Sequence, residues 1–274
     1  MSAHLRFWLA GVTLCAAAPV GCSPGGSGED RTPINVILLS LDTLRADRLG
    51  AYGNQGGLTP FLDSLAEEGV VMDNCIASST WTLPSHWTLF LGQYPSTHGV
   101  WARSSAYDGA APTMAEVFRG AGYETAAFVG GGYVSSEFGF GAGFDTYDEQ
   151  SRSGLGELRD YRARLEEWIL TPRSSPYFLF LQMYDVHRPY TPGFEDLLSL
   201  RPDARRTDLD HGKPPQGVPN ENWDPTTLGI IESLYDAEVR ILDRALGTLF
   251  GDFEEAGLLE NTIVVVTSDH GEGF

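Results

Sequence analysis

The sequence predicts an α/β domain built on a mostly parallel central sheet with helices on both faces. Three long apolar runs, at 35–42, 176–187 and 261–273, are rich in β-branched and aromatic residues and lead into acidic residues. Such runs lack polar alternation, which is typical of strands covered on both faces. Helical patterns separate the runs, and strands that alternate with helices favour a doubly wound sheet. A chain of 274 residues, 42% of them hydrophobic, is long enough for one large domain.

The remaining elements follow from local patterns. Helices are expected at 59–69, 112–122, 158–170 and 226–257, and a shorter strand at 125–131. Several of these helical patterns close with a glycine, which is a usual helix stop. We expect 130–149, rich in glycine and aromatic residues, to form a loop over one end of the sheet, and the polar, proline-rich 201–225 to lie at the surface. Because the sequence stops at Phe274, just after a strand and a turn, we expect the C-terminal part of the fold to be missing.

The first residues have the layout of a secretory signal peptide, with Arg6 followed by a short apolar run. That run is too short to be a permanent membrane span. We therefore divide the chain into a signal peptide (1–22), a flexible linker (23–32) and a folded domain (33–274). Cys22 directly after Gly21 resembles a bacterial lipoprotein processing site. This predicts an exported protein, periplasmic or in the cell envelope, with simple secretion and a lipid anchor on Cys22 both open.

Charge and cysteine content exclude several classes of protein. The formal net charge is −19, and no basic stretch is present to neutralise phosphates, so a nucleic-acid partner is not expected. A small anionic substrate is still allowed, since one site can be locally positive in an acidic protein. After removal of the leader only Cys22 and Cys75 are left, which argues against a disulfide framework and against a thiolate metal site. We expect Cys75 to be a small core residue.

Ionisable side chains follow all three long strands: Asp42 after the first, Asp185 with His187 after the second, and Asp269 with His270 after the third. In open parallel sheets, ligands bind beyond the carboxyl ends of the strands. Taken singly, each aspartate has an ordinary alternative as a helix cap or turn residue. Carboxylates gathered at one edge repel each other unless a cation or a proton intervenes. Oxygen and imidazole ligands suit one divalent metal ion, and Ca, Mg, Mn and Zn are all admitted.

Thr82 lies two residues before Pro84, which suits the first turn of a helix that ends near Gly92. The Thr82 hydroxyl would then lie at the positive end of that helix, beside backbone N–H groups that favour an anion. A threonine hydroxyl is a poor nucleophile unless a base or a metal lowers its pKa. A metal held by Asp42, Asp269 and His270 would do this. The alternative is that Thr82 only caps the helix.

Taken together, these motifs resemble the sulfatase family within the alkaline phosphatase superfamily. The resemblance covers about 33–274, with the motifs in the family's order, and is carried by NVILLSLDTLRADRLGAYG (35–53), TWTLPSH (80–86), LFLGQYPSTHGV (89–100), PYFLFLQMYDVHRPYTP (176–192) and NTIVVVTSDHGEGF (261–274). It implies that Asp42, Asp269 and His270 are metal ligands, with Thr82 as the metal-bound nucleophile. It further implies that His187 contacts the substrate or the leaving group.

The sequence departs from the family's pattern at the nucleophile. Sulfatases carry Cys or Ser there, in Cys/Ser-x-Pro-x-Arg, and oxidise it to formylglycine, whereas this chain has Thr82 and places His86 at the arginine position. A threonine would give a ketone rather than an aldehyde, which argues against formylglycine maturation. His86 is then expected to orient or stabilise Thr82. The usual Gly-Lys-Trp-His-Leu-Gly segment appears as FVGGGYV (128–134), without its lysine and histidine. The set resembles the threonine-nucleophile branch, which includes phosphoglycerol transferases.

Three functions follow as hypotheses. The first is a secreted metal-dependent hydrolase that cleaves a sulfate or phosphate ester through Thr82, or a transferase of the phosphoglycerol or phosphoethanolamine type. The second is a true sulfatase that works without formylglycine. The third is a non-catalytic binding protein with the sulfatase fold, against which the retention of Asp42, Asp269 and His270 argues. The substrate is expected to be an anionic ester, and the sequence indicates no oligomeric state.

Overall fold

The computed structural model describes residues 33–150, 155–212 and 223–274. Its strands form one five-stranded sheet in the order β3-β2-β4-β1-β5, and every neighbouring pair is parallel. The strands are β1 (Asn35–Leu41), β2 (Glu124–Val129), β3 (Thr146–Glu149), β4 (Tyr177–Met183) and β5 (Thr262–Thr267). The α-helices are α1 (Pro60–Glu68), α2 (Thr82–Leu91), α3 (Pro95–His98), α4 (Met114–Gly120), α5 (Leu158–Leu170), α6 (Phe194–Leu200) and α7 (Pro225–Glu255). The predicted α/β class with a parallel sheet is confirmed.

The central strand β1 shows why the strand sequences are apolar on both faces. Its side chains alternate, so that Ile37 and Leu39 enter one hydrophobic core while Leu38 enters the other. β4 does the same, with Leu179 on the first side and Phe180 on the second. Both strands are buried from water on both faces, and this removes the polar alternation that a half-exposed strand would show.

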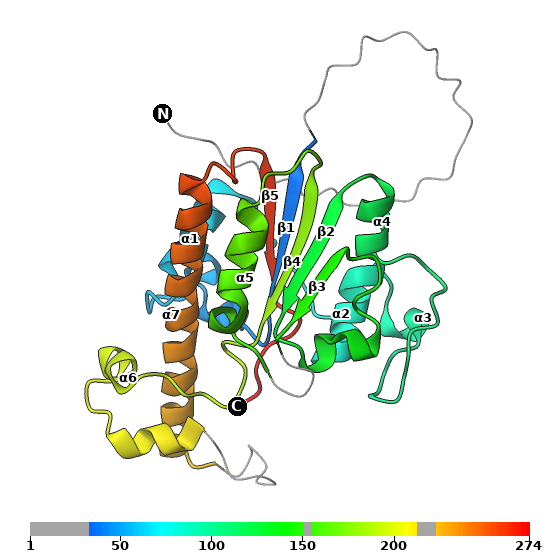
Figure 1. Cartoon of the computed structure of the whole chain (residues 1–274). Helices are drawn as coiled ribbons and strands as arrows, with labels where there is room; N and C mark the ends of the chain where they lie inside the picture. The colour runs from blue at the N-terminus through cyan, green and yellow to red at the C-terminus, as the bar shows by residue number, and fades with distance from the viewer. Residues whose placement is uncertain (1–32, 151–154, 213–222) are drawn as a thin grey trace, which may run out of the picture.

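Helices cover both faces of the sheet (Figure 1). On one side lie α1, α5 and the long α7, which pack on the first core, and on the other lie α2 and α4, which pack on the second. The short 3-10 helices are η1 (Ala46–Arg48), η2 (Gly50–Tyr52), η3 (Gly132–Val134), η4 (Ser136–Phe138) and η5 (Arg206–Gly212). Within the described residues, no helix is both long and apolar enough to cross a membrane.

The predicted helices agree with the structure to within a few residues. α5 has the predicted bounds, and α7 covers nearly all of the predicted 226–257. Asp224 caps α7 by accepting from the amides of Thr226 and Thr227, and Pro225 takes its first position. The predicted stop of α2 is also confirmed, because Gly92 adopts a left-handed conformation with φ of 62° and its amide donates to the Thr88 carbonyl.

Four expectations were wrong or incomplete. The predicted loop 130–149 ends in an edge strand, β3, whose residues are only partly buried and therefore lack an apolar run. The helices α3 and α6 were not predicted, since each is too short to show a period. Within 201–225 the structure forms η5, and 213–222 lie outside the described residues. Cys75 is exposed rather than in the core, because it lies on the surface connection between α1 and α2. The predicted signal peptide, the predicted linker and Cys22 lie outside the described residues.

Candidate active site

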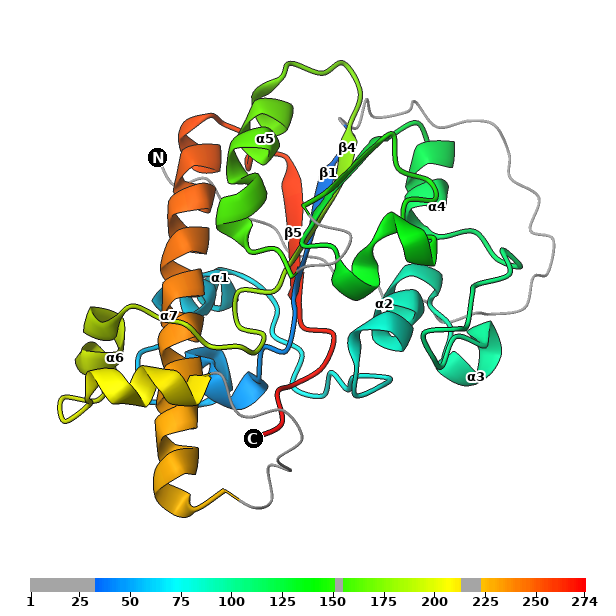
Figure 2. The same cartoon turned by 60° about the horizontal axis from the view of Figure 1, so that its bottom comes forward.

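The parallel pairing of β1 with β5 brings the acidic residues that follow these strands together. Asp42 comes one residue after β1, and Asp269 and His270 come just after β5. Figure 2 brings this end of the sheet forward and shows the turn after β1 and the C-terminal residues side by side. One ligand atom from each of the three side chains lies within 4.8 Å of the other two. The predicted grouping of Asp42, Asp269 and His270 is thus present in the structure.

Three atoms of this group lack hydrogen-bond partners although they are buried: Asp42 Oδ1, Asp269 Oδ2 and His270 Nε2. The last two face each other at 3.3 Å. Burial, followed by the nearby charge of Asp269, raises the pKa of Asp42 well above its usual value. Two buried carboxylate oxygens and an imidazole nitrogen, all without hydrogen-bond partners, are a set of ligand atoms that suits a divalent cation. The residues present therefore fit such an ion.

Thr82 joins this group from the opposite core layer. α2 begins at Thr82, and the Thr82 hydroxyl donates to Asp42 Oδ2 at 3.2 Å. The N-cap position belongs to Trp81, whose side chain makes no capping hydrogen bond. The Thr82 hydroxyl is thus directed at the carboxylate, and no capping hydrogen bond joins it to the amides of α2. The Thr82 and Leu83 amides, in the first turn of α2, have no acceptor within the helix.

His86 lies one turn further along α2 and is fully buried. Its Nδ1 is 3.0 Å from the Thr82 carbonyl oxygen and 3.6 Å from Asp269 Oδ2, and its Nε2 is 2.9 Å from Ser40 Oγ. Burial lowers the pKa of His86, which favours the neutral ring. Because a carbonyl can only accept, Nδ1 carries the hydrogen and Nε2 accepts from Ser40. His86 thus links α2 to β1 behind Thr82.

Sequence reasoning missed Ser40 and Thr43. Ser40 is a fully buried polar residue inside an apolar strand, two positions before Asp42 and on the same face, and this periodicity was the available signal. Thr43 has φ of 60°, which is strained for a β-branched residue. Its amide donates to Asp269 Oδ1, its hydroxyl donates to the Val186 carbonyl, and its carbonyl accepts from Tyr235. These three bonds hold the turn that aims Asp42.

The predicted pair Asp185 and His187, which follows the second long strand, does not join the cluster. Asp185 Oδ2 accepts from the Leu158 amide at the start of α5. The His187 ring packs edge-on against Tyr184, with centroids 5.6 Å apart, and its Nδ1 contacts the Arg188 carbonyl. Among the described residues, His187 has no hydrogen bond to Asp42, Asp269, His270 or Thr82. It lies at the same end of the sheet, since it follows β4, the neighbour of β1.

Asp185 gives a testable dependence of stability on pH. Burial raises the pKa of Asp185 to about 7. The unfolded chain releases this proton near pH 4, so folding stability falls as the pH rises from there toward 7. In Asp185→Asn the side-chain amide oxygen can still accept from the Leu158 backbone amide, and the fall in folding stability with rising pH no longer occurs. We expect the melting temperature of this variant to rise relative to the unaltered protein between about pH 5 and about pH 8. Asp203→Asn is the control, since that side chain is 80% exposed; an equal change in both variants would contradict the prediction.

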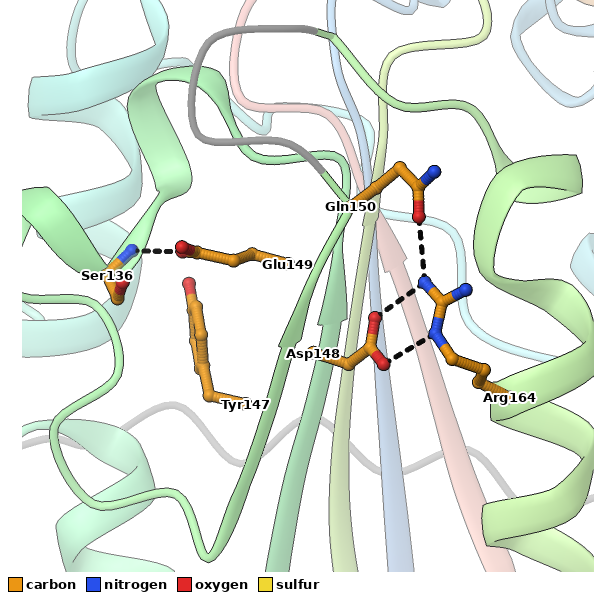
Figure 3. Close-up of a pocket in the computed structure, with 6 residues that line it drawn as sticks. All are labelled: Ser136, Tyr147, Asp148, Glu149, Gln150 and Arg164. Carbon is orange, nitrogen blue, oxygen red and sulfur yellow. Dashed lines mark hydrogen bonds and ion pairs between the residues drawn. The ribbon is translucent and has the colours of Figure 1, made fainter.

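A pocket of about 500 Å³ lies at the other edge of the sheet, beside β3 and α5. Figure 3 shows Arg164 directed at Asp148 and Gln150, and Glu149 directed at Ser136. Arg164 forms a two-point ion pair with Asp148, with distances of 2.7 and 2.8 Å, and donates to Gln150. The positive charge of this pocket is therefore already neutralised. The pocket shares no lining residue with the cluster around Thr82.

The chain is similar in sequence or in fold to several named proteins. It is 26% identical over 280 residues to an ulvan-active sulfatase of Formosa agariphila, covering 89% of this chain and 52% of the relative. A phosphonate monoester hydrolase of Agrobacterium radiobacter superposes with a TM-score of 0.70 at 20% identity, covering 88% of this chain and 63% of that one. A lipoteichoic acid synthase of Listeria monocytogenes superposes with a TM-score of 0.61 at 19% identity, covering 88% and 57%.

The chain therefore spans about half the length of the curated relative and roughly three fifths of the solved structures. The solved neighbours have the alkaline phosphatase and sulfatase fold, which agrees with the three-layer arrangement described above. Residues 34–274, which is nearly the whole of the chain from Pro33 onward, match the sulfatase family itself. The chain belongs to the sulfatase family.

Proposed function

We propose that this chain carries the nucleophile and the metal site of an exported hydrolase that cleaves a sulfate or phosphate ester through Thr82. One observation supports this most directly. The buried Thr82 hydroxyl donates to Asp42 at 3.2 Å, within a group of carboxylate and imidazole atoms that lack partners. The name of the ulvan-active sulfatase supports a sulfate ester, and that of the phosphonate monoester hydrolase supports a phosphoryl group.

Thr82 would act as the nucleophile. A divalent cation, when bound by Asp42, Asp269 and His270, would supply the positive charge that lowers the pKa of the threonine hydroxyl and attracts the ester oxygens. Thr82 Oγ1 passes its proton to Asp42 Oδ2, to which it already donates, and forms a bond to the sulfur or phosphorus, while the bond to the leaving oxygen breaks. Water then attacks the same atom, the bond to Thr82 Oγ1 breaks, and Thr82 regains a proton while the water oxygen stays on the released sulfate or phosphate. The free amides at the start of α2 stabilise the charge on the remaining oxygens.

Two histidines take different roles in this proposal. His86 is a positioning residue, because it contacts the Thr82 carbonyl, Ser40 and Asp269 and is sealed from solvent. His187 is the proposed general acid for the leaving oxygen. It is half-buried at the end of the same sheet, and its packing against Tyr184 holds the ring in place. A transferred proton would leave from Nε2, since Nδ1 faces the Arg188 carbonyl.

Transfer to an alcohol is the second candidate. The observation that favours it is the threonine itself, which replaces the Cys or Ser of formylglycine-dependent sulfatases. The lipoteichoic acid synthase among the structural neighbours supports it. In this case an acceptor alcohol takes the place of water in the second step, and the first step is unchanged.

The full-length protein tests the proposal with 4-nitrophenyl sulfate, 4-nitrophenyl phosphate and bis(4-nitrophenyl) phosphate. We expect release of nitrophenol from at least one ester, and a mass increase of one sulfuryl or phosphoryl group on the peptide that contains Thr82 after acid quenching. Addition of glycerol should divert product to a glycerol ester if the protein is a transferase. No turnover of any of the three esters by the metal-loaded protein would contradict the proposal and favour a non-catalytic role.

A further inference from the structure

Asp42 lies in a turn that its own residues do not stabilise. Asp42 and Thr43 are the two central residues of this turn, which the Leu44 amide closes on the Leu41 carbonyl at 3.2 Å. Thr43, at the third position, has φ of 60°. Glycine or asparagine is usual at such a position, because a β-branched side chain is strained there. Contacts from outside the turn must therefore hold it, and with it the direction of Asp42.

The Tyr235 side chain of α7 supplies two of these contacts through one atom. Its hydroxyl donates to the Thr43 carbonyl at 2.9 Å and accepts from the Arg45 amide at 2.9 Å. A single oxygen thus bridges a residue inside the turn and a residue just after it. Burial raises the pKa of Tyr235, so the hydroxyl keeps the proton that it donates.

Tyr235 is itself held in place. The side chain is fully buried, and its ring meets the rings of Tyr190 and Phe274 edge-on, with centroids 5.6 and 5.2 Å apart. It belongs to the middle of α7, a helix of 31 residues that packs on the sheet. A side chain fixed in this way sets the position of the turn, because the turn is strained and Tyr235 is not.

The same turn is joined to the segment that carries the other two proposed metal ligands. The Thr43 amide donates to Asp269 Oδ1 at 3.2 Å, and the Arg45 guanidinium donates to the Glu272 carbonyl at 2.8 Å. A shift of the turn would therefore change the position of Asp42 relative to Asp269. Metal affinity depends on such distances, since each ligand atom must reach the same ion.

We propose that Tyr235 is a positioning residue for the metal site, and that it acts through the turn that directs Asp42. This inference rests on the proposed function, whose metal ligands it takes as given. Tyr235 is not itself a ligand, since both of its hydrogen bonds go to the backbone of the turn. The alternative is that Tyr235 only fills the core.

The test is binding of Co²⁺ to the metal-free, full-length protein, followed by calorimetry and by the visible absorption of the bound ion. Co²⁺ accepts the oxygen and imidazole ligands that the site offers. Tyr235→Phe keeps the ring and removes both hydrogen bonds. It should weaken Co²⁺ binding about tenfold and change the absorption spectrum, because the direction of Asp42 is no longer fixed.

Tyr161→Phe is the matched control. Tyr161 is also fully buried on the same side of the sheet, and its hydroxyl donates to the Gln182 carbonyl at 3.0 Å. It belongs to α5 and does not contact the turn. This variant should lose some stability but keep the Co²⁺ affinity and the spectrum. Equal losses of affinity in the two variants would show that Tyr235 only fills the core.

Thr43→Gly tests whether Tyr235 acts through the strained turn. Glycine adopts φ of 60° without strain, so the turn then depends less on Tyr235. In the Thr43→Gly protein, Tyr235→Phe should weaken Co²⁺ binding only about threefold. The same loss in both backgrounds would overturn the proposed route through Thr43.

A reciprocal measurement needs no substitution. If the turn positions Asp42, bound Co²⁺ must in return stabilise the turn. Hydrogen exchange of the Arg45 amide should slow at least about tenfold on addition of Co²⁺. The Phe61 amide, which donates to Asp243, is the internal control and should exchange at an unchanged rate. Unchanged exchange at Arg45 would overturn the inference.

Failure of this inference is distinguishable from failure of the proposed function. Absence of Co²⁺ binding by the unaltered protein would contradict the proposed metal site, and the inference with it. Co²⁺ binding that is equally strong in Tyr235→Phe would overturn the inference alone. Neither measurement requires turnover of an ester.

Discussion

Thr82→Ala is expected to lower kcat for ester cleavage by at least about a thousandfold. The variant removes the only hydroxyl that the structure directs at Asp42 from α2, and water must then attack without the covalent step. Thr82→Ser keeps the hydroxyl and should retain measurable activity. Initial rates on the best of the nitrophenyl esters check both, and the mass increase on the Thr82 peptide should be absent in Thr82→Ala.

Thr88→Ala is the matched control for this variant. Thr88 lies on the same helix, and its hydroxyl donates to the Pro84 carbonyl rather than to the acidic group. Its removal should leave kcat within a few fold of the unaltered protein. Full activity in Thr82→Ala would exclude Thr82 as the nucleophile. An equal loss of activity in Thr88→Ala would show that α2 contributes through its fold.

Removal of the proposed divalent ion is expected to lower the melting temperature by about 5 to 10 °C when that ion is present at roughly a hundred times its dissociation constant. The reason is electrostatic. Without a cation, Asp42 and Asp269 are two buried carboxylates in one small group, and neither has all its oxygens satisfied. Scanning calorimetry with and without EDTA measures the shift, and elemental analysis of the purified protein measures the ion.

Asp42→Asn should reduce the bound metal and remove the effect of EDTA on melting, because one anionic ligand is lost. Asp243→Asn is the control. Asp243 is also buried, but its two oxygens accept from the amides of Phe61 and Leu62, so it serves α1 rather than the metal group. This variant should be less stable yet keep its metal and its response to EDTA. A response to EDTA in Asp42→Asn as large as in the unaltered protein would contradict the predicted ligand.

The strands and helices that could be predicted are those whose burial leaves a mark on the sequence. β1 and β4 are covered on both faces and so consist of apolar residues, and α5 and α7 carry a helical period and recognisable ends. β3 was missed for the opposite reason. It lies at the sheet edge, and all four of its residues are only partly buried. The exposure of Cys75 was also beyond reach, since a cysteine in a short apolar stretch does not reveal which surface loop carries it.

By itself, the sequence determined that acidic residues follow buried parallel strands and that a threonine begins a helix, because strand burial and helix ends depend on neighbouring residues. It therefore indicated Asp42, Thr82, Asp269 and His270. Only the tertiary structure decided that Thr82 donates to Asp42, that Ser40 binds His86, and that Asp185 turns away toward α5. These contacts depend on strand order and on which face each helix covers, and neither is encoded in a local pattern.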